Sequence, residues 1–220
     1  NGFCLLKNIA IAAEAARAAG LTDRIAVIDW DVHHGNGTEA IYYERADTLA
    51  ISIHQERNYP RDTGAFEDRG AGAGAGRNLN IPLPPGGGHA TYIEAFERVV
   101  IPQLQAFQPD VIVVACGFDA SGVDPLGRMM AGSDTFRALT ELTLEAADEL
   151  CDGKLVMSHE GGYSEAHVPF CGHAVLEALS GSDIAAPDPL ADRITSQQPG
   201  PRFRAYCATL IAEMEAALDP

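Results

Sequence analysis

Asp29, Asp31 and His33 alternate with other residues near the end of a short apolar run, and Gly35 and Gly37 follow them. On an extended backbone, alternate side chains point to the same side of the chain. A carboxylate and an imidazole two residues apart can therefore bind one metal ion, while the glycines let the backbone turn sharply. The alternative interpretation is an Asp–His hydrogen bond at a strand end that holds no metal.

A second segment supplies two more carboxylates, Asp119 and Asp124, at the end of another apolar run. Buried carboxylates without a partner are costly to desolvate, and a metal ion offsets that cost. Taken alone, Asp124 followed by Pro125 is also typical of an ordinary Asp-type turn or a helix cap.

The third segment places Tyr163 directly after Gly161 and Gly162. A tyrosine hydroxyl can donate a hydrogen bond to an oxygen that gains negative charge during a reaction. The alternative is a glycine turn followed by a packing aromatic side chain.

Asp31, His33 and Asp124 together offer three nitrogen and oxygen ligands with room for a water molecule. An open site of this kind suits catalytic zinc, or Fe(II) under some conditions. Such a metal polarises a carbonyl group and lowers the pKa of its bound water. With Tyr163 to activate the carbonyl, the three segments predict amide hydrolysis.

The apolar pattern predicts the elements that position these side chains. Strands are expected at 24–31, 48–54, 110–120 and 154–163, and helices at 8–19, 38–45, 90–107, 134–151, 167–180 and 203–218. Residues 55–88 are interpreted as loop and 186–201 as a connection. Pro102 predicts a kink or break, and Ser133 or Asp134 a helix cap.

Strands that alternate with helices, and that are almost continuously apolar, predict an α/β fold with a parallel sheet covered on both faces. Ligands of such sheets bind at the carboxyl ends of the strands. Three of the four predicted strands end in the polar segments described above, so the chemistry is expected at this edge of the sheet.

Composition limits the classes of function. The chain has 220 residues, enough for one domain or one and a half, and its 15 Lys+Arg against 31 Asp+Glu give a net charge of −16. This charge argues against nucleic-acid binding, and no apolar run reaches the ~18 residues of a membrane span. Five cysteines without a CxxC pair predict a reducing, cytoplasmic setting.

The motifs, taken in order, resemble those of zinc-dependent histone deacetylases, above all the class II branch and the bacterial histone deacetylase-like amidohydrolases. They stand at 1–4, 29–38, 51–55, 80–86, 117–120, 124–127 and 160–163. The resemblance covers residues 1 to about 180 of a single deacetylase domain over 1–220, with 181–220 as a helical tail. It implies an arginase/deacetylase-type fold whose complete sheet has eight parallel strands.

The resemblance also implies roles for individual residues. Asp31, His33 and Asp124 match the ligands of one zinc ion per chain, and Tyr163 matches the residue that hydrogen-bonds the substrate carbonyl. His34 is implied as a supporting residue rather than a catalytic one. A structural potassium ion is implied near Asp29, Asp31, His33, Ser52 and Ile53, and a substrate tunnel is implied along Gly2, Phe3, Tyr59 and Gly161.

One feature of the family has no counterpart in this sequence. The catalytic His-His pair of these enzymes lies shortly upstream of the segment that matches Gly2 and Phe3, and this chain begins at that segment. The pair His33-His34 belongs to the metal motif and cannot replace it. We therefore expect a fragment that holds the C-terminal two-thirds or so of the domain and that hydrolyses acetyl-lysine poorly on its own.

The expected reaction is hydrolysis of an acetylated amine, typically Nε-acetyl-lysine, to acetate and the free amine. Acetylpolyamine amidohydrolases share these motifs, and the acidic chain would attract a cationic polyamine or a basic peptide equally well. An arginase-like ureohydrolase would need a second metal and an Asp where Gly35 stands. The missing His-His pair favours a fourth alternative, a non-catalytic scaffold that binds zinc or acyl-lysine. The sequence leaves an oligomer open.

Overall fold

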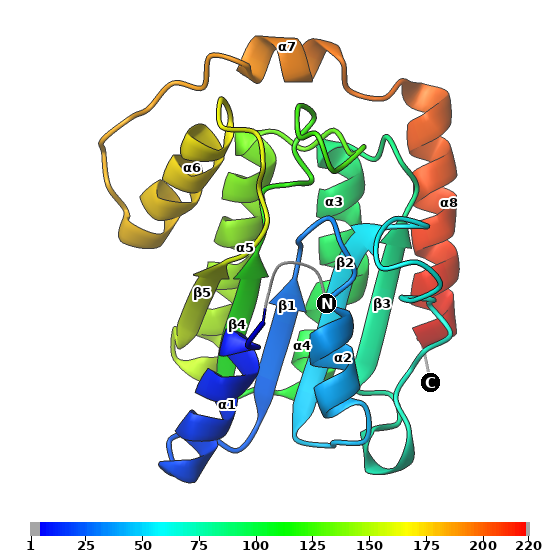
Figure 1. Cartoon of the computed structure of the whole chain (residues 1–220), viewed down its shortest axis with the longest axis vertical. Coiled ribbons are helices and arrows are strands. Elements are labelled where there is room, and N and C mark those ends of the chain that lie inside the picture. The colour runs from blue at the N-terminus through cyan, green and yellow to red at the C-terminus, as the bar shows by residue number, and fades with distance from the viewer. Residues whose placement is uncertain (1–4, 219–220) are drawn as a thin grey trace.

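One parallel sheet of five strands runs through the structure, a computed structural model that describes residues 5–218 (Figure 1). The predicted tunnel residues Gly2 and Phe3 lie outside the described residues. The strand order is β3-β2-β1-β4-β5. The strands are β1 (Ile25–Asp29), β2 (Thr48–Gln55), β3 (Asn78–Leu83), β4 (Val111–Cys116) and β5 (Leu155–His159).

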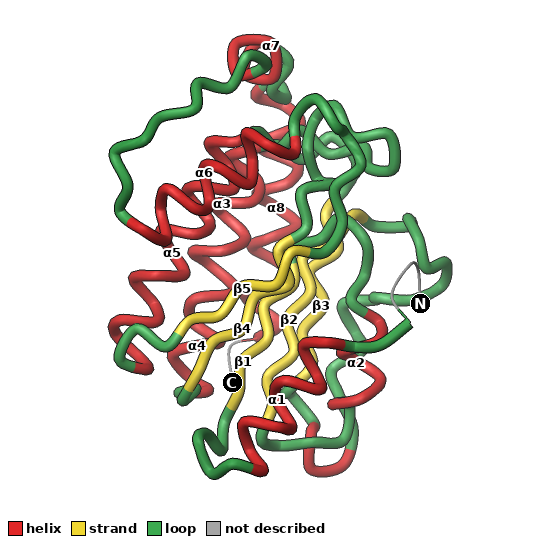
Figure 2. The backbone as a smooth tube through the Cα atoms, turned by 60° about the vertical axis from the view of Figure 1, so that its left-hand side comes forward, coloured by secondary structure: helices red, strands yellow, loops and turns green. Residues whose placement is uncertain are grey.

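Helices cover both faces of the sheet, as Figure 2 shows most clearly. One face carries α1 (Asn8–Ala18) and α2 (Asn36–Tyr42). The other face carries α3 (His89–Ala95), α4 (Ile101–Phe107), α5 (Ser133–Cys151), α6 (Val168–Ser180) and α8 (Pro201–Leu218), while α7 (Ala191–Ser196) lies beyond the carboxyl ends of the strands.

The alternation of side chains along β1 explains the two layers. Val27 packs with Ile9 in the smaller core under α1, whereas Ile28 packs in the main core with Phe96 and Leu139. Because successive side chains of a strand point to opposite faces, an unbroken apolar strand must be covered on both sides. The predicted parallel sheet with helices on both faces is therefore what the structure has.

Four of the five strands lie where the sequence predicted them, and β3 was missed. It falls inside the segment interpreted as loop, because Pro82 interrupts its pattern. β3 is an edge strand, paired only with β2 among the described strands, and an edge position tolerates proline. The predicted strands at 110–120 and 154–163 are too long, since β4 ends at Cys116 and β5 at His159.

The helix predictions need three changes. The predicted helix 90–107 contains a π-helical segment, Phe96–Val100, and Pro102 lies in the first turn of α4. The N-cap of α5 is Gly132, whose N–H donates to the Thr135 hydroxyl at 3.1 Å. α7 was not predicted. Within residues 5–218, every helix is too short or too polar to cross a membrane.

The tail beyond residue 180 is tied to loops at the carboxyl edge of the sheet. The Gln198 amide donates to the carbonyl of Met130 at 2.6 Å and accepts the N–H of His89 at 2.9 Å. Arg98 forms an ion pair with Glu215 of α8. The sequence showed only helical patterns in this region, so these contacts are new information from the structure.

Candidate metal centre

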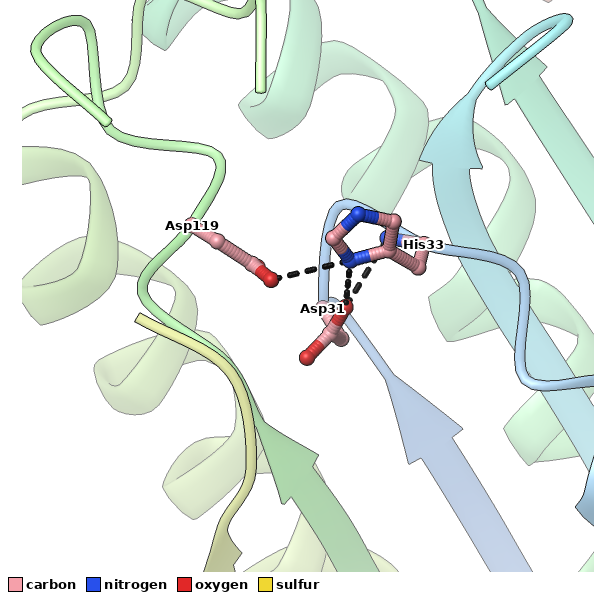
Figure 3. Close-up of side chains that lie close together, drawn as sticks. All are labelled: Asp31, His33 and Asp119. Carbon is pink, nitrogen blue, oxygen red and sulfur yellow. Dashed lines mark hydrogen bonds and ion pairs between the residues drawn. The ribbon is translucent and has the colours of Figure 1, made fainter. Parts of the chain in front are cut away.

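Two neighbouring strands, β1 and β4, deliver the polar side chains to one place. Asp29 pairs in register with Ala115, so both strands end at the same level of the sheet. Asp31 and His33 lie in the loop after β1, and Asp119 lies in the loop after β4. The possible ligand atoms of Asp31, His33 and Asp119 all lie within 4.8 Å of one another (Figure 3).

Both carboxylates meet the same atom of the imidazole. Nδ1 of His33 is 3.0 Å from Oδ1 of Asp31 and 3.0 Å from Oδ2 of Asp119. The second oxygen of each carboxylate accepts a backbone N–H, from Gly161 for Asp31 and from Val32 for Asp119, each at 2.8 Å. The backbone therefore fixes both carboxylates so that one oxygen of each faces His33 (Figure 3).

The structure differs from the sequence prediction at the third member of this group. Asp119 lies where Asp124 was expected. The carboxylate of Asp124 instead accepts backbone N–H groups, from Leu126 at 2.9 Å, from Tyr163 at 2.7 Å and from Ser164 at 3.2 Å. Asp124 thus holds the loop that carries Tyr163 and does not face His33.

Gly161, predicted to line the substrate tunnel, lies directly against the carboxylates of Asp119 and Asp31. A Cβ atom at Gly161 would collide with Oδ2 of both Asp119 and Asp31, and one at Gly117 would come within 2.6 Å of Oδ2 of Asp31. Only glycine lets the backbone approach the two carboxylates this closely. The glycines after β4 and β5 are therefore part of the site.

Burial and hydrogen bonding act against each other on the pKa values of His33 and Asp119. Although burial opposes it, the hydrogen bonds and charges of Asp119 and Asp31 raise the pKa of His33 to about 10. Burial raises the pKa of Asp119 to about 6, against the lowering effect of the hydrogen bond from His33. At neutral pH, protonated His33 therefore supplies the cation that the half-buried carboxylate of Asp31 and the buried one of Asp119 require.

A cavity of about 850 Å³ opens beside this group. Tyr163 lines it and is 37% exposed. Burial and the charges of Asp119, Asp31 and Asp124 raise the pKa of Tyr163 to about 12. Tyr59 also lines the cavity, and its ring stands edge-on to that of His33 with the ring centres 6.3 Å apart. Other lining residues are Leu5, Lys7, Asn58, Leu126, His159, Glu160 and Gly161.

Asp29 and Ser52, two of the residues predicted near a potassium ion, lie in a buried polar region beside the cavity. Ser52 accepts the N–H of Gly35 at 3.1 Å, and Asp29 is buried next to Gly35. Burial and the charge of Asp31 raise the pKa of Asp29 well above its ordinary value. His34 lies 3.0 Å from the Thr63 hydroxyl and 3.4 Å from a carboxylate oxygen of Glu39, whereas Ile53 belongs to the apolar core.

Comparison with known proteins decides the family. The model of the histone deacetylase domain matches residues 1–179. The chain belongs to the histone deacetylase family. It is 54% identical over 215 residues to a histone deacetylase-like amidohydrolase of Pseudomonas aeruginosa, an alignment that covers 98% of this chain and 57% of that protein. It is 39% identical to histone deacetylase 14, chloroplastic, of Arabidopsis thaliana, over 84% of this chain and 44% of that one.

Solved structures of the deacetylase family have the same fold. The histone deacetylase Clr3 superposes with a TM-score of 0.80 at 30% identity, over 98% of this chain and 35% of that one. An acetylpolyamine aminohydrolase from Burkholderia pseudomallei gives a TM-score of 0.74 at 36% identity, over 81% of this chain and 51% of that one. The predicted family and fold class are confirmed, and the chain spans about half the length of the relatives it matches.

The sequence offers Asp119 as well as Asp124 after the same apolar run, and the resemblance assigned the ligand role to Asp124. The useful signal was its position, because Asp119 is the first carboxylate after β4 (Val111–Cys116) and therefore stays near the strand end. Glu160 and Lys7, two charged residues that line the cavity, were also missed. Their charge alone did not distinguish them from ordinary surface residues.

Proposed function

We propose that the protein carrying this chain is a zinc-dependent hydrolase that removes the acetyl group from an acetylated amine, giving acetate and the free amine. The proposal rests on one observation, the convergence of Asp31, His33 and Asp119 beside a cavity that Tyr163 also lines. Membership of the histone deacetylase family supports the same reaction.

The residues present fit zinc. Zinc takes imidazole nitrogen and carboxylate oxygen ligands, and three protein ligands are the usual number in a catalytic site. Asp31, Asp119 and His33 supply that set, and a divalent ion can replace the proton that His33 holds between the two carboxylates. We therefore assign one zinc ion per chain to these three residues, with Asp119 in place of Asp124. When bound, zinc polarises a substrate carbonyl and acidifies a water molecule.

Tyr163 supplies the hydrogen bond to the reacting carbonyl. With a pKa of about 12 it keeps its proton at neutral pH, so it can donate to the carbonyl oxygen as negative charge develops there. Asp124 positions it, because its carboxylate accepts the backbone N–H of Tyr163 at 2.7 Å. Tyr59 and Leu126 provide apolar lining for the acyl and alkyl parts of the substrate.

We extend the proposal to a structural potassium ion near Asp29 and Ser52. A buried carboxylate with a raised pKa is a group whose charge lacks compensation. A monovalent cation there would supply it, and the Ser52 hydroxyl lies in the same polar region.

Two substrates remain in the proposal, an acetyl-lysine peptide and an acetylpolyamine. The net charge of −16 favours a cationic substrate in either case and disfavours nucleic acid. The structural similarity to an acetylpolyamine aminohydrolase supports the second candidate.

The test uses the protein as its gene encodes it, incubated with zinc and with either an acetyl-lysine peptide or acetylputrescine. We expect acetate release from at least one substrate, its loss with a chelator and its return with added zinc. A protein that binds zinc but releases acetate from neither would be a binding scaffold, and the proposed hydrolysis would be wrong.

The cysteines support the predicted reducing, cytoplasmic setting, which is also part of the proposal. Those within residues 5–218 are all buried and unpaired: Cys116, Cys151, Cys171 and Cys207. Unpaired cysteines are usual in proteins of reducing compartments.

A further inference from the structure

A second histidine, His167, lies in a buried row of hydrogen bonds outside the candidate metal centre. Its Nδ1 is 2.6 Å from the hydroxyl oxygen of Ser121, and its Nε2 is 2.8 Å from Oδ2 of Asp188. The Ser133 hydroxyl donates to the same oxygen of Asp188 at 2.7 Å. The row joins the loop after β4, the start of α6, the start of α5 and the connection between α6 and α7.

The order Ser–His–Asp is also that of nucleophilic hydrolases, but this row cannot reach a substrate. Ser121 is 1% exposed and His167 is 0% exposed. Neither residue lines the cavity of about 850 Å³ beside Asp31 and His33. A function for this row must therefore act through the residues that Ser121 holds in place.

Ser121 ends the turn that carries Asp119. Its N–H donates to the carbonyl of Phe118 at 3.1 Å, which places Asp119 inside the turn, and its own carbonyl accepts the N–H of Asp124 at 3.0 Å. Ser121 also forms an isolated bridge with Ala131. A shift of Ser121 would therefore move the backbone of Asp119, the carboxylate that faces His33.

The far end of the row is anchored by Asp188. Its Oδ1 accepts the N–H of Leu190 at 2.8 Å, and its Oδ2 accepts the Ser133 hydroxyl. Although burial opposes it, these hydrogen bonds and the one from His167 lower the pKa of Asp188, so it is a carboxylate at neutral pH. Because a carboxylate only accepts hydrogen bonds, Nε2 of His167 carries a proton and donates it to Asp188.

We propose that His167 and Asp188 are positioning residues for the metal centre: through Ser121 they fix the turn that presents Asp119. Asp188 lies beyond residue 179, where the match to the histone deacetylase domain ends. The tail of this chain thus contributes to the geometry of a site formed by the matched domain. This inference rests on the proposed function, since it requires Asp119 to hold the metal.

The experiment measures Co²⁺ binding, by titration and by the visible absorption bands of the bound ion, in the protein as its gene encodes it. We expect Asp188→Ala, His167→Phe and Ser121→Ala each to weaken Co²⁺ binding about tenfold, as loss of a residue supporting a ligand does, and to change the absorption bands. Asp192→Ala is the matched control, because Asp192 is an exposed carboxylate nearby on α7.

A double variant tests whether the effect passes along the row. Ser121→Ala combined with Asp188→Ala should bind Co²⁺ about as well as Asp188→Ala alone, because both changes interrupt one path. Additive losses, or folded single variants whose affinity stays within about twofold of the wild type, would overturn the inference. If His167→Phe does not fold, Ser121→Ala decides, since it removes one hydroxyl oxygen.

The two proposals fail in different ways. Wild-type protein that binds no Co²⁺ would overturn the metal assignment, and this inference with it. Wild-type protein that binds Co²⁺, together with variants that bind it equally well, would overturn the positioning role alone.

Discussion

His33 and His167 both contact carboxylates or hydroxyls of the loop after β4, but their surroundings differ. Two carboxylates, Asp31 and Asp119, meet one nitrogen of His33, whose side chain is 21% exposed. Each ring nitrogen of His167 has its own oxygen partner, and this side chain is 0% exposed.

The difference shows how to separate a ligand from a structural histidine. Around His167 every polar group has a partner within the protein, and neither Ser121, His167 nor Asp188 lines the cavity. Around His33 two acceptors compete for a single proton, and a cavity gives access to it. The number of acceptors per ring nitrogen, more than the depth of burial, distinguishes the two clusters.

The most direct test of the difference between the two histidines is His33→Ala. We expect zinc binding to weaken by more than about 100-fold, beyond the loss caused by removing a supporting residue, because a ligand disappears and two carboxylates remain without a cation. A competition titration against a chromophoric chelator measures this. His173→Ala, a half-buried histidine paired with Glu177 on α6, is the control, and equal losses in both variants would refute the assignment.

A second test compares the two carboxylates of one loop. Asp119→Asn should weaken zinc binding about 100-fold, whereas Asp124→Asn, which changes only an acceptor of backbone N–H groups, should weaken it less than about tenfold. The same titration applies to both variants. The reverse order would restore Asp124 as the ligand that the sequence predicted.

Tyr163→Phe tests whether the cavity beside Asp31, His33 and Asp119 is a catalytic site. The phenol donates to the carbonyl only as charge develops, so kcat should fall about 100-fold while KM changes little. Steady-state kinetics of acetate release provide the measurement. Tyr59→Phe removes the other phenol of the cavity and should leave kcat nearly unchanged. Similar kinetics for the two variants would deny Tyr163 its role.

Gly161→Ala tests the close approach of the backbone to the two carboxylates, and the loss of zinc affinity should be modest. Gly161→Ala places a methyl group against Asp119 and Asp31, so zinc affinity should fall about tenfold. Gly200→Ala is the matched control, because a Cβ there meets no atom within 4 Å. Zinc affinity that is equal in the two variants would mean that the carboxylates can move away without cost.

The sequence was sufficient where a pattern is local. β1, β2, β4 and β5 were predicted because their residues are almost continuously apolar. Asp31 and His33 were found because they alternate next to a strand end. Asp119 was left without a ligand role because the resemblance assigned the third ligand to Asp124, whereas β4 ends at Cys116 and leaves Asp119 in the loop beside His33.

The sequence could not reveal contacts between distant segments. Ser121 and His167 are 46 residues apart, and His167 and Asp188 are 21 apart, so no spacing rule connects them. β3 was hidden for a different reason, since Pro82 fits only an edge strand and the order of strands is not visible in the sequence. Both features depend on the tertiary arrangement of the chain.

The contacts of Gln198 and Asp188 have a practical consequence for recombinant work. A boundary drawn at residue 179, where similarity to the domain family stops, would delete both side chains together with α8. The carbonyl of Met130 and the N–H of His89 would lose their partners, and the apolar surface that Ile211 and Met214 cover would meet water. Expression of this protein should therefore retain every residue through Leu218.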